Sequence, residues 1–181
     1  MKKIAGFTII EVLITVTIAG ILAAIAAPSF AWLIRDTRFT TEANNMVAAF
    51  NMARSEAAKR GGVARVDANT VDADLWGNGW TLWVDQDGDD ARAGSGTATA
   101  GDDLETMRVG DALKAPLTLS ANGVVSIQYQ PTGIADGRDD ADAAVAAPYR
   151  FDLCNGEAGV TGRRITITNT GHVSVANLTC P

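Results

Sequence analysis

The feature that most constrains this chain is an apolar stretch of 28 residues close to its N-terminus. It runs from Phe7 to Ile34 and contains one charged residue, Glu11. A helix needs about 20 mostly apolar residues to cross a bilayer, so this stretch is long enough to do so. The short segment before it, residues 1–6, carries Lys2 and Lys3, which would keep the N-terminus on the cytoplasmic side. We therefore expect the rest of the chain to be exported.

An ordinary secretory signal is the alternative explanation of this stretch. Such a signal is cut at small residues after its apolar part, and the alanines between residues 23 and 27 offer a cleavage site. Glu11 argues against it, because a carboxylate in lipid costs about 2.5–3.5 kcal/mol and a discarded signal does not need one. The helical pattern also continues beyond Ile34. The alternative would leave a simple exported or membrane-anchored domain whose mature N-terminus lies near Pro28.

The residues at the start of the stretch resemble a known signal. Gly6–Leu13, which reads GFTIIEVL, is similar to the class III signal of type IV pilins and type II secretion pseudopilins. The resemblance implies that prepilin peptidase cuts after Gly6 and that the new N-terminal residue, Phe7, is methylated. It also implies that Glu11 pairs with a neighbouring subunit's N-terminal amine in a filament, since a buried charge is tolerated only when paired.

A second helical segment follows the apolar stretch. Pro28 removes one helix hydrogen bond and is expected to kink the helix, but amphipathic spacing continues to Arg60, where Lys59-Arg60-Gly61-Gly62 is a stop signal. One long helix is expected from about Thr8 to Arg60. Its apolar face after Ile34 is expected to comprise Phe39, Ala43, Met46, Val47, Phe50, Ala53 and Ala57.

The residues at the end of this helix restrict the resemblance to one branch of the pilin-like proteins. Ala53–Gly61, which reads ARSEAAKRG, resembles the GspH/FimT branch of minor pilins and pseudopilins, and so does Gly79–Asp89. Within the latter segment Trp80, Leu82 and Val84 are expected in the core, and Trp83 as well. The type IV pilus and the type II secretion system both fit this branch.

Beyond Gly62 the chain alternates between short apolar runs and turn signals, which predicts an antiparallel sheet. The expected fold class is α+β, a pilin fold in which the long N-terminal helix packs on an antiparallel β-sheet head. Asp85–Asp111 and Ala135–Ala147 are expected as exposed loops. The expected strands are Val63–Val66, Trp80–Val84, Leu117–Leu119, Val124–Tyr129, Tyr149–Leu153, Arg164–Thr168 and His172–Val175.

The expected domain organisation has four parts. Residues 1–6 form the leader peptide and residues 7–34 the transmembrane or filament-core half of the helix. Residues 35–61 form its amphipathic half, and residues 62–181 form the β-rich head.

Charge bears on whether the head binds DNA. The net charge of -6 makes the chain an unlikely partner for nucleic acid unless basic residues cluster locally. Arg163 and Arg164 are the candidates, because some relatives in the FimT group bind DNA through basic residues near the C-terminus. Here the comparable turn, Gly171–Ser174, lacks arginine, so both are expected to be solvated charges beside a strand. A DNA-binding tip subunit remains the alternative function.

The sequence contains candidates for two further kinds of site. Asp85, Asp87 and Asp89 alternate like the first ligands of a calcium loop, but Asp90 and Gly96 stand where that loop needs glycine and glutamate, so a solvated acidic hairpin is preferred. The two cysteines, Cys154 and Cys180, are expected to form one disulfide in an exported domain, with two buried free thiols as the alternative.

The sequence predicts a structural protein rather than an enzyme. No nucleophile, metalloprotease, phosphate-loop or dinucleotide motif is present, and no cofactor is expected. The resemblance implies a minor pilin or pseudopilin that initiates or caps a filament. Its expected partners are prepilin peptidase and other pilins, met through the N-terminal helix. It is expected to cross the inner membrane once, with the head in the periplasm, before it enters a pilus or pseudopilus.

Overall fold

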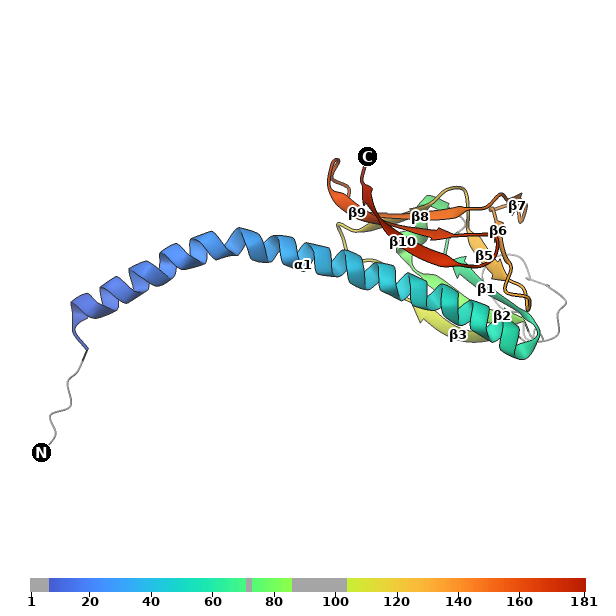
Figure 1. The fold of residues 1–181 in the computed structure, drawn as a ribbon, viewed down its shortest axis with the longest axis horizontal. Helices are drawn as coiled ribbons and strands as arrows, with labels where there is room; N and C mark the ends of the chain where they lie inside the picture. The colour runs from blue at the N-terminus through green and yellow to red at the C-terminus, as the bar shows by residue number, and fades with distance from the viewer. Residues whose placement is uncertain (1–6, 71–72, 86–103) are drawn as a thin grey trace, which may run out of the picture. The chain divides into compact units, whose positions relative to one another are not determined.

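The computed structural model describes residues 7–70, 73–85 and 104–181 and shows one long helix followed by β-strands (Figure 1). The helix, α1, is continuous from Ile9 to Arg60, as expected. The chain divides into two compact units, Met1–Arg38 and Phe39–Pro181, and α1 contributes to both. The second unit is the α+β head.

The C-terminal part of α1 packs on the head through one apolar face. The predicted face is confirmed, because Phe39, Phe50 and Ala57 are fully buried and Val47 is half-buried. Ala49 is buried as well, although the expected spacing did not include it. The helix ends where Gly61 takes a left-handed conformation with φ of 70° and donates its N–H to the Ala57 carbonyl oxygen.

Charged side chains form ion pairs with one another in the last turn of α1. Arg60 Nε lies 2.9 Å from Glu56 Oε2, and Lys59 Nζ lies 3.5 Å from Glu56 Oε1. The hydrogen bond from Arg60 lowers the pKa of Glu56 below its usual value. These cations also complement the negative end of the helix dipole.

The strands form two antiparallel sheets. The larger has the order β3-β2-β1-β5-β6-β7 and the smaller the order β10-β9-β8-β4. The strands of the larger sheet are β1 (Val63–Ala68), β2 (Trp80–Asp85), β3 (Leu104–Gly110), β5 (Ser126–Tyr129), β6 (Ala135–Arg138) and β7 (Ala144–Val145). The smaller sheet contains β4 (Thr118–Ala121), β8 (Tyr149–Cys154), β9 (Thr161–Ile167) and β10 (Val173–Thr179), and a 3-10 helix, η1 (Ala73–Asn78), precedes β2.

All seven expected strands are present, within a few residues of their expected bounds. The expected loops are partly wrong. Asp85–Asp111 includes β3, and Ala135–Ala147 includes β6 and β7. These strands lie at or next to the edge of the larger sheet and bury little apolar surface, so their sequences lack the alternation that marks a strand.

Aromatic side chains from the helix, η1 and the smaller sheet meet in the core. The ring centroids of Phe50 and Phe151 are 5.1 Å apart, and those of Trp76 and Phe151 are 4.9 Å apart in an edge-to-face arrangement. Trp76 Nε1 donates a hydrogen bond to the Val124 carbonyl oxygen at 2.6 Å, which satisfies the polar atom of a fully buried ring. This cluster joins three separate parts of the head.

The two sheets are also joined by hydrogen bonds at one residue of β6. The N–H of Ala135 donates to the Asn169 carbonyl oxygen at 2.8 Å, and the carbonyl oxygen of Ala135 accepts from Tyr149 Oη at 3.2 Å. Gly137, two residues on, leaves the space that the Tyr149 ring fills, because a Cβ there would collide with the ring. The sheets are therefore held together by these hydrogen bonds as well as by the core.

The predicted disulfide is confirmed. Cys154, at the end of β8, is bonded to Cys180, which follows β10, and the two Cα atoms are 5.9 Å apart. The bond passes over β9 at Gly162. A Cβ at Gly162 would lie 2.7 Å from Cys180 Sγ and would clash with the Leu153 carbonyl oxygen, so only glycine fits beneath the bridge.

Removal of this bridge should destabilise the head. Replacing Cys154 and Cys180 together by alanine opens a loop whose closure stabilises the fold by about 3–4 kcal/mol in the chain-entropy model. We expect a fall of that size in the free energy of unfolding, measured by urea denaturation of the oxidised parent and the variant. Equal midpoints for the two proteins would contradict the expectation.

A second prediction concerns the aromatic cluster. Phe50→Ala removes a fully buried ring and should lower the free energy of unfolding of the head by about 3–5 kcal/mol. Phe30→Ala is the matched control, because Phe30 belongs to the same helix but its side chain is 62% exposed. Thermal unfolding followed by near-ultraviolet circular dichroism should shift for Phe50→Ala and stay unchanged for Phe30→Ala.

Candidate functional site

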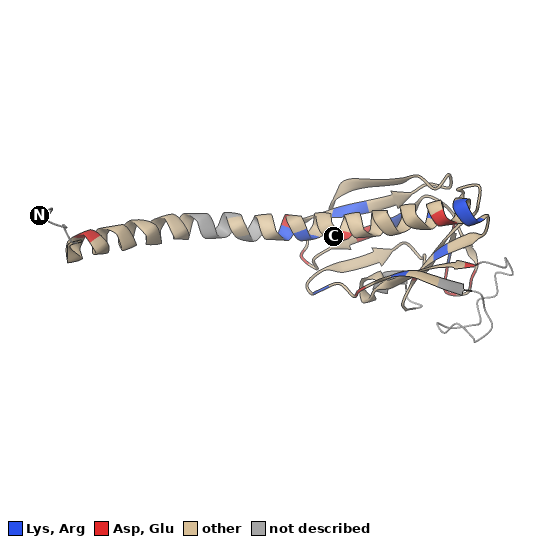
Figure 2. Cartoon of the chain, turned by 90° about the horizontal axis from the view of Figure 1, so that it is seen from below, with Lys and Arg blue, Asp and Glu red and all other residues tan. Residues whose placement is uncertain are grey.

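The N-terminal part of α1 exposes apolar side chains on all sides. Of the large apolar side chains exposed in the described part of the chain, all but Val109, Ile134 and Val175 lie between residues 7 and 34. Their exposed fractions range from 50% at Val12 to 84% at Phe7. Figure 2 shows charged residues gathered on the head and few on this part of the helix. A helix that is apolar all round is stable only when lipid or other protein covers it.

This stretch is the segment expected to cross a membrane. In the part of the chain that the structure describes, no helix is long and apolar enough to do so. The expected span over residues 7–34 includes residues 26–29, 31 and 32, whose side chains lie outside the described part. The membrane span therefore stays a prediction.

The first turn of α1 holds an arrangement that the sequence analysis missed. The N–H of Glu11 donates to Thr8 Oγ1 at 3.3 Å, and the N–H of Thr8 donates to Glu11 Oε2 at 3.4 Å. This reciprocal pair is a capping box, and the spacing Thr8-x-x-Glu11 was its signature in the sequence. Before any assembly, the Glu11 carboxylate thus satisfies a backbone donor at the start of its own helix.

The structure describes only some of the other residues that were expected to act in processing or to shape the helix. Gly6 lies outside the described residues. Phe7 precedes the helix and is exposed, one residue before the capping Thr8. Pro28 lies within the continuous helix, but its side chain is not among those described, so the expected kink stays a prediction.

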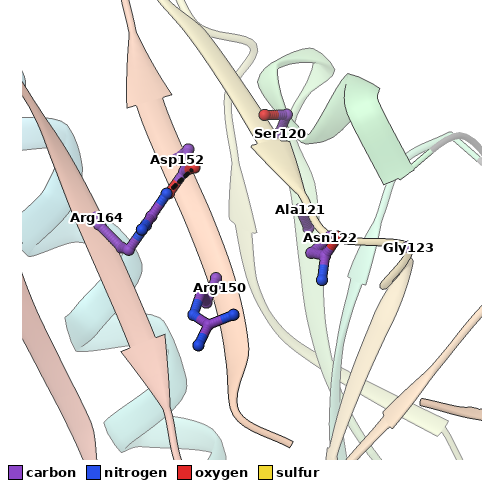
Figure 3. Close-up of a pocket in the computed structure, with 7 residues that line it drawn as sticks. All are labelled: Ser120, Ala121, Asn122, Gly123, Arg150, Asp152 and Arg164. Carbon is purple, nitrogen blue, oxygen red and sulfur yellow. Dashed lines mark hydrogen bonds and ion pairs between the residues drawn. The ribbon is translucent and has the colours of Figure 1, made fainter. Parts of the chain in front are cut away.

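On the head, Arg164 is not the solvated charge that was expected. It lies opposite Asp152 in the pairing of β8 and β9, and its Nε and Nη2 donate to the two carboxylate oxygens of Asp152, both at 2.6 Å (Figure 3). The hydrogen bond that Arg164 donates to Asp152 raises the pKa of Arg164, so the two charges neutralise each other. The neighbouring Arg163 also lies within β9, and its Nη1 donates to the Gly162 carbonyl oxygen at 3.3 Å.

A shallow hollow of about 520 Å³ lies beside this pair. Arg150 projects beside it from β8 and is exposed. The hollow is lined by Ser120, Ala121, Asn122, Gly123, Arg150, Asp152 and Arg164. An anion would meet Asp152 as well as the arginines there, which weakens the case for a DNA site.

The calcium and enzyme alternatives gain no support. Asp85 was expected in a solvated hairpin, but it is the last residue of β2 and is buried, while Asp87 and Asp89 lie outside the described residues. No group of three histidine, cysteine, aspartate or glutamate side chains in the described ranges could hold a metal ion. Both cysteines are in the disulfide, so neither offers a thiol to His172.

A buried polar cluster on the larger sheet was also missed. Arg65, which is 1% exposed, lies with its guanidinium 5.3 Å from the Trp83 ring centroid and donates to Ser126 Oγ at 3.3 Å. Trp83 is buried, as expected, and its Nε1 donates a hydrogen bond to Asp67 Oδ2. The alternation of Arg65 and Asp67 with Ala64 and Val66 in β1 marked this polar face. The contacts of this polar cluster lie within the larger sheet, so we assign the cluster a role in stabilising that sheet.

The geometry defines a class of protein. A long N-terminal helix packed on antiparallel sheets, with an exposed apolar stretch before the head, is the α+β pilin-like fold, as expected. Two crystal structures of the type IV minor pilin FimU of Pseudomonas aeruginosa (strain PAO1) share it. In space group P21 the TM-score is 0.56 at 20% identity, over 78% of this chain and 90% of that chain. In space group P65 it is 0.53 at 20% identity, over 76% and 91%.

Family models give the more specific result. Residues 42–171 match the model of type II transport protein GspH, and residues 1–27 match the prokaryotic N-terminal methylation motif. The chain therefore belongs to the GspH family. Among curated proteins, none matches it. The family consists of structural filament subunits, which agrees with the expectation that the chain is not an enzyme.

The capping box generates a prediction about the start of α1. Thr8→Ala removes the hydroxyl that accepts the Glu11 N–H and should destabilise the first turn by about 1 kcal/mol. Faster amide hydrogen exchange at Glu11 and Val12, measured by NMR in detergent micelles, would report this loss. Thr17→Ala is the control, since the Thr17 hydroxyl donates to the Leu13 carbonyl oxygen within the helix and caps nothing. Equal exchange at Glu11 in the two variants would contradict the prediction.

Proposed function

We propose that this chain is a minor pilin or pseudopilin that helps to initiate or cap a filament of a type IV pilus or a type II secretion system. The observation that carries the proposal is the exposure of the large apolar side chains that the structure describes in the N-terminal part of α1. Neighbouring helices would cover this surface in a filament, and lipid would cover it before assembly. The match to the methylation motif over residues 1–27 supports the same route.

In this proposal the chain matures in two steps. Prepilin peptidase cuts between Gly6 and Phe7, and the new amine of Phe7 is methylated. The inner membrane holds the precursor through residues 7–34, with the head in the periplasm. The new N-terminus then lies four residues before Glu11, at the start of an exposed apolar helix.

In this proposal Glu11 sets the register in which one subunit docks on the next. When a helix enters the filament core, its carboxylate would be buried among apolar side chains, which is tolerable only beside a cation. The amine of a neighbouring Phe7 is such a cation. The carboxylate would exchange the N–H of Thr8, 3.4 Å away in the free subunit, for that amine. A subunit docked out of register would leave both charges unpaired.

DNA capture is not favoured as a second function. The candidate cation Arg164 is neutralised by Asp152, and the head as a whole is acidic.

The processed N-terminus tests the first step. Intact-mass and peptide mass spectrometry of the chain from its native host should show a mature protein that begins at methylated Phe7. A mature chain that begins near Pro28, or an uncut Met1, would contradict the proposal, because either would remove the assembly helix or its free amine.

Glu11→Gln tests the pairing. The variant should still be cut at Phe7, but its share in sheared filaments should fall at least about tenfold, because one partner of a buried ion pair is lost. Glu42→Gln is the matched control, an acid on the same helix outside the apolar stretch. Quantitative immunoblotting of filament and membrane fractions gives the ratio. Equal incorporation of both variants would show that Glu11 does not guide assembly.

A further inference from the structure

Two turns that lie far apart in the sequence meet at one residue of α1. Residues 130–134 connect β5 to β6 in the larger sheet, and residues 168–172 connect β9 to β10 in the smaller sheet. Each turn contains a glycine at positive φ, Gly133 at 83° and Gly171 at 74°. A Cβ on Gly133 would lie 3.0 Å from Arg54 Nε, and a Cβ on Gly171 would lie 3.3 Å from the same atom. The Arg54 guanidinium therefore packs against the backbone of both turns.

Backbone hydrogen bonds fix the two turns against which Arg54 packs. Gly133 donates its N–H to the Gln130 carbonyl oxygen and Gly171 donates its N–H to the Thr168 carbonyl oxygen, both at 2.8 Å. A Cβ on Gly171 would also collide with the Gly133 carbonyl oxygen, so the two turns touch directly. Because the guanidinium is positioned by this packing, a partner that binds it loses less affinity to side-chain ordering.

Arg54 has no polar partner in the part of the chain that the structure describes. No hydrogen bond or ion pair joins its guanidinium to any described residue, although the side chain is half-buried. Neither turn contains an acidic residue, nor do positions 50, 51, 57 and 58, which lie one helical turn away. The head contains other arginines that each contact a carboxylate, a carbonyl oxygen or an aromatic ring: Arg60, Arg65, Arg108, Arg138, Arg163 and Arg164.

The phenol of Tyr129 does not supply the missing negative charge. Its ring packs against the second turn, since a Cβ on Gly171 would lie 3.2 Å from Tyr129 Cε1. Tyr129 is fully buried, and this burial raises its pKa well above the usual value, so the phenol stays neutral. No nitrogen of Arg54 is among the buried side-chain atoms that lack a hydrogen bond in the described residues, so an anion from outside can reach the guanidinium.

The surface beside Arg54 is apolar. Ile134, which follows Gly133 directly, has a side chain that is 44% exposed, and Pro131 in the same turn is exposed as well. We call Arg54, Pro131 and Ile134 the Arg54 patch. A positioned arginine beside apolar side chains is typical of the centre of a protein–protein interface. A nucleic acid would need several cations together, and the two turns contain no lysine or arginine.

We propose that the Arg54 patch is a docking site for an acidic side chain on the head of a different filament subunit. A carboxylate would accept paired hydrogen bonds from the planar guanidinium, and apolar atoms of the partner would cover Ile134. This inference rests on the proposed function, because assembly through α1 supplies the neighbouring head. Contact between apolar helices does not distinguish one pilin from another, whereas a charge pair between heads selects the neighbour.

Substitutions at Arg54 test the charge in the host that assembles the filament. Arg54→Gln should lower the share of the chain in sheared filaments about tenfold, because a charge-assisted pair of hydrogen bonds is lost. Arg54→Lys keeps the positive charge and should lower this share less. Arg150→Gln is the matched control and should leave it unchanged. Arg150 is exposed, and it projects from the face of the smaller sheet opposite to Phe151, which packs on α1.

A second pair of variants separates docking from stability. Ile134→Glu and Ile134→Lys keep Arg54 and change an exposed side chain, so both should unfold at the temperature of the parent. Ile134→Glu should lower incorporation more than Ile134→Lys, because its carboxylate would pair with Arg54 and repel an acidic partner. This pair decides the matter if thermal unfolding shows that Arg54→Gln is destabilised. Equal incorporation of Ile134→Glu and Ile134→Lys would overturn the acidic partner.

Cross-linking identifies the occupant. A photo-reactive amino acid at position 134 should cross-link, within filaments, to a segment of a different subunit that contains aspartate or glutamate. Cross-links only to a second copy of this chain or to nucleic acid would overturn the proposal, and so would incorporation of a folded Arg54→Gln variant at the level of the parent. Failure of the parent chain to be cut or to enter filaments would instead refute the proposed function.

Discussion

The head depends on the burial of one helix face against two sheets. Each sheet alone would leave an apolar face in water, and the C-terminal part of α1 covers both. At the centre the Phe50 ring packs against Phe151 of the smaller sheet and against Trp76, whose indole N–H binds the loop before β5. Alanines at positions 43, 49, 53 and 57 are buried in the core that the helix shares with the strands. This shared contact and the hydrogen bonds at Ala135 together hold the two sheets against each other.

The same helix has a second part that cannot stabilise a monomer in water. Up to Ile34 it offers apolar side chains on all sides, and the first charges after Glu11 are Arg35 and Asp36. The C-terminal part of this one helix thus stabilises the head, and its N-terminal part offers a surface for association with lipid or other protein. The change from an apolar cylinder to an amphipathic stripe in the sequence marks where one ends and the other begins.

Much of this could be predicted from the sequence because the signals are local and periodic. The helix, its buried face and its stop at Gly61 follow from 3.6-residue spacing and from charge and glycine at the end. The strands β3, β6 and β7 could not be predicted, because strands near a sheet edge are specified by a hydrogen-bonded neighbour far away in sequence. Nor could the partner of Arg164, since only the register of β8 and β9 brings Asp152 opposite to it. The spacing of Thr8 and Glu11 is the sequence signature of a capping box, so this contact could have been predicted. The resemblance to pilins pointed only to a role of Glu11 in assembly.

The disulfide has a mechanical consequence. Cys180 follows the open edge strand, and its bond to Cys154 reaches across β9 to β8. A pull on the C-terminal end of β10 therefore loads a covalent bond and the middle of the sheet, rather than peeling the β10–β9 hydrogen bonds apart one at a time. Tension applied at the C-terminus would therefore pass into the centre of the smaller sheet. Gly162, which leaves room for the bridge, is thus part of the path that carries the force.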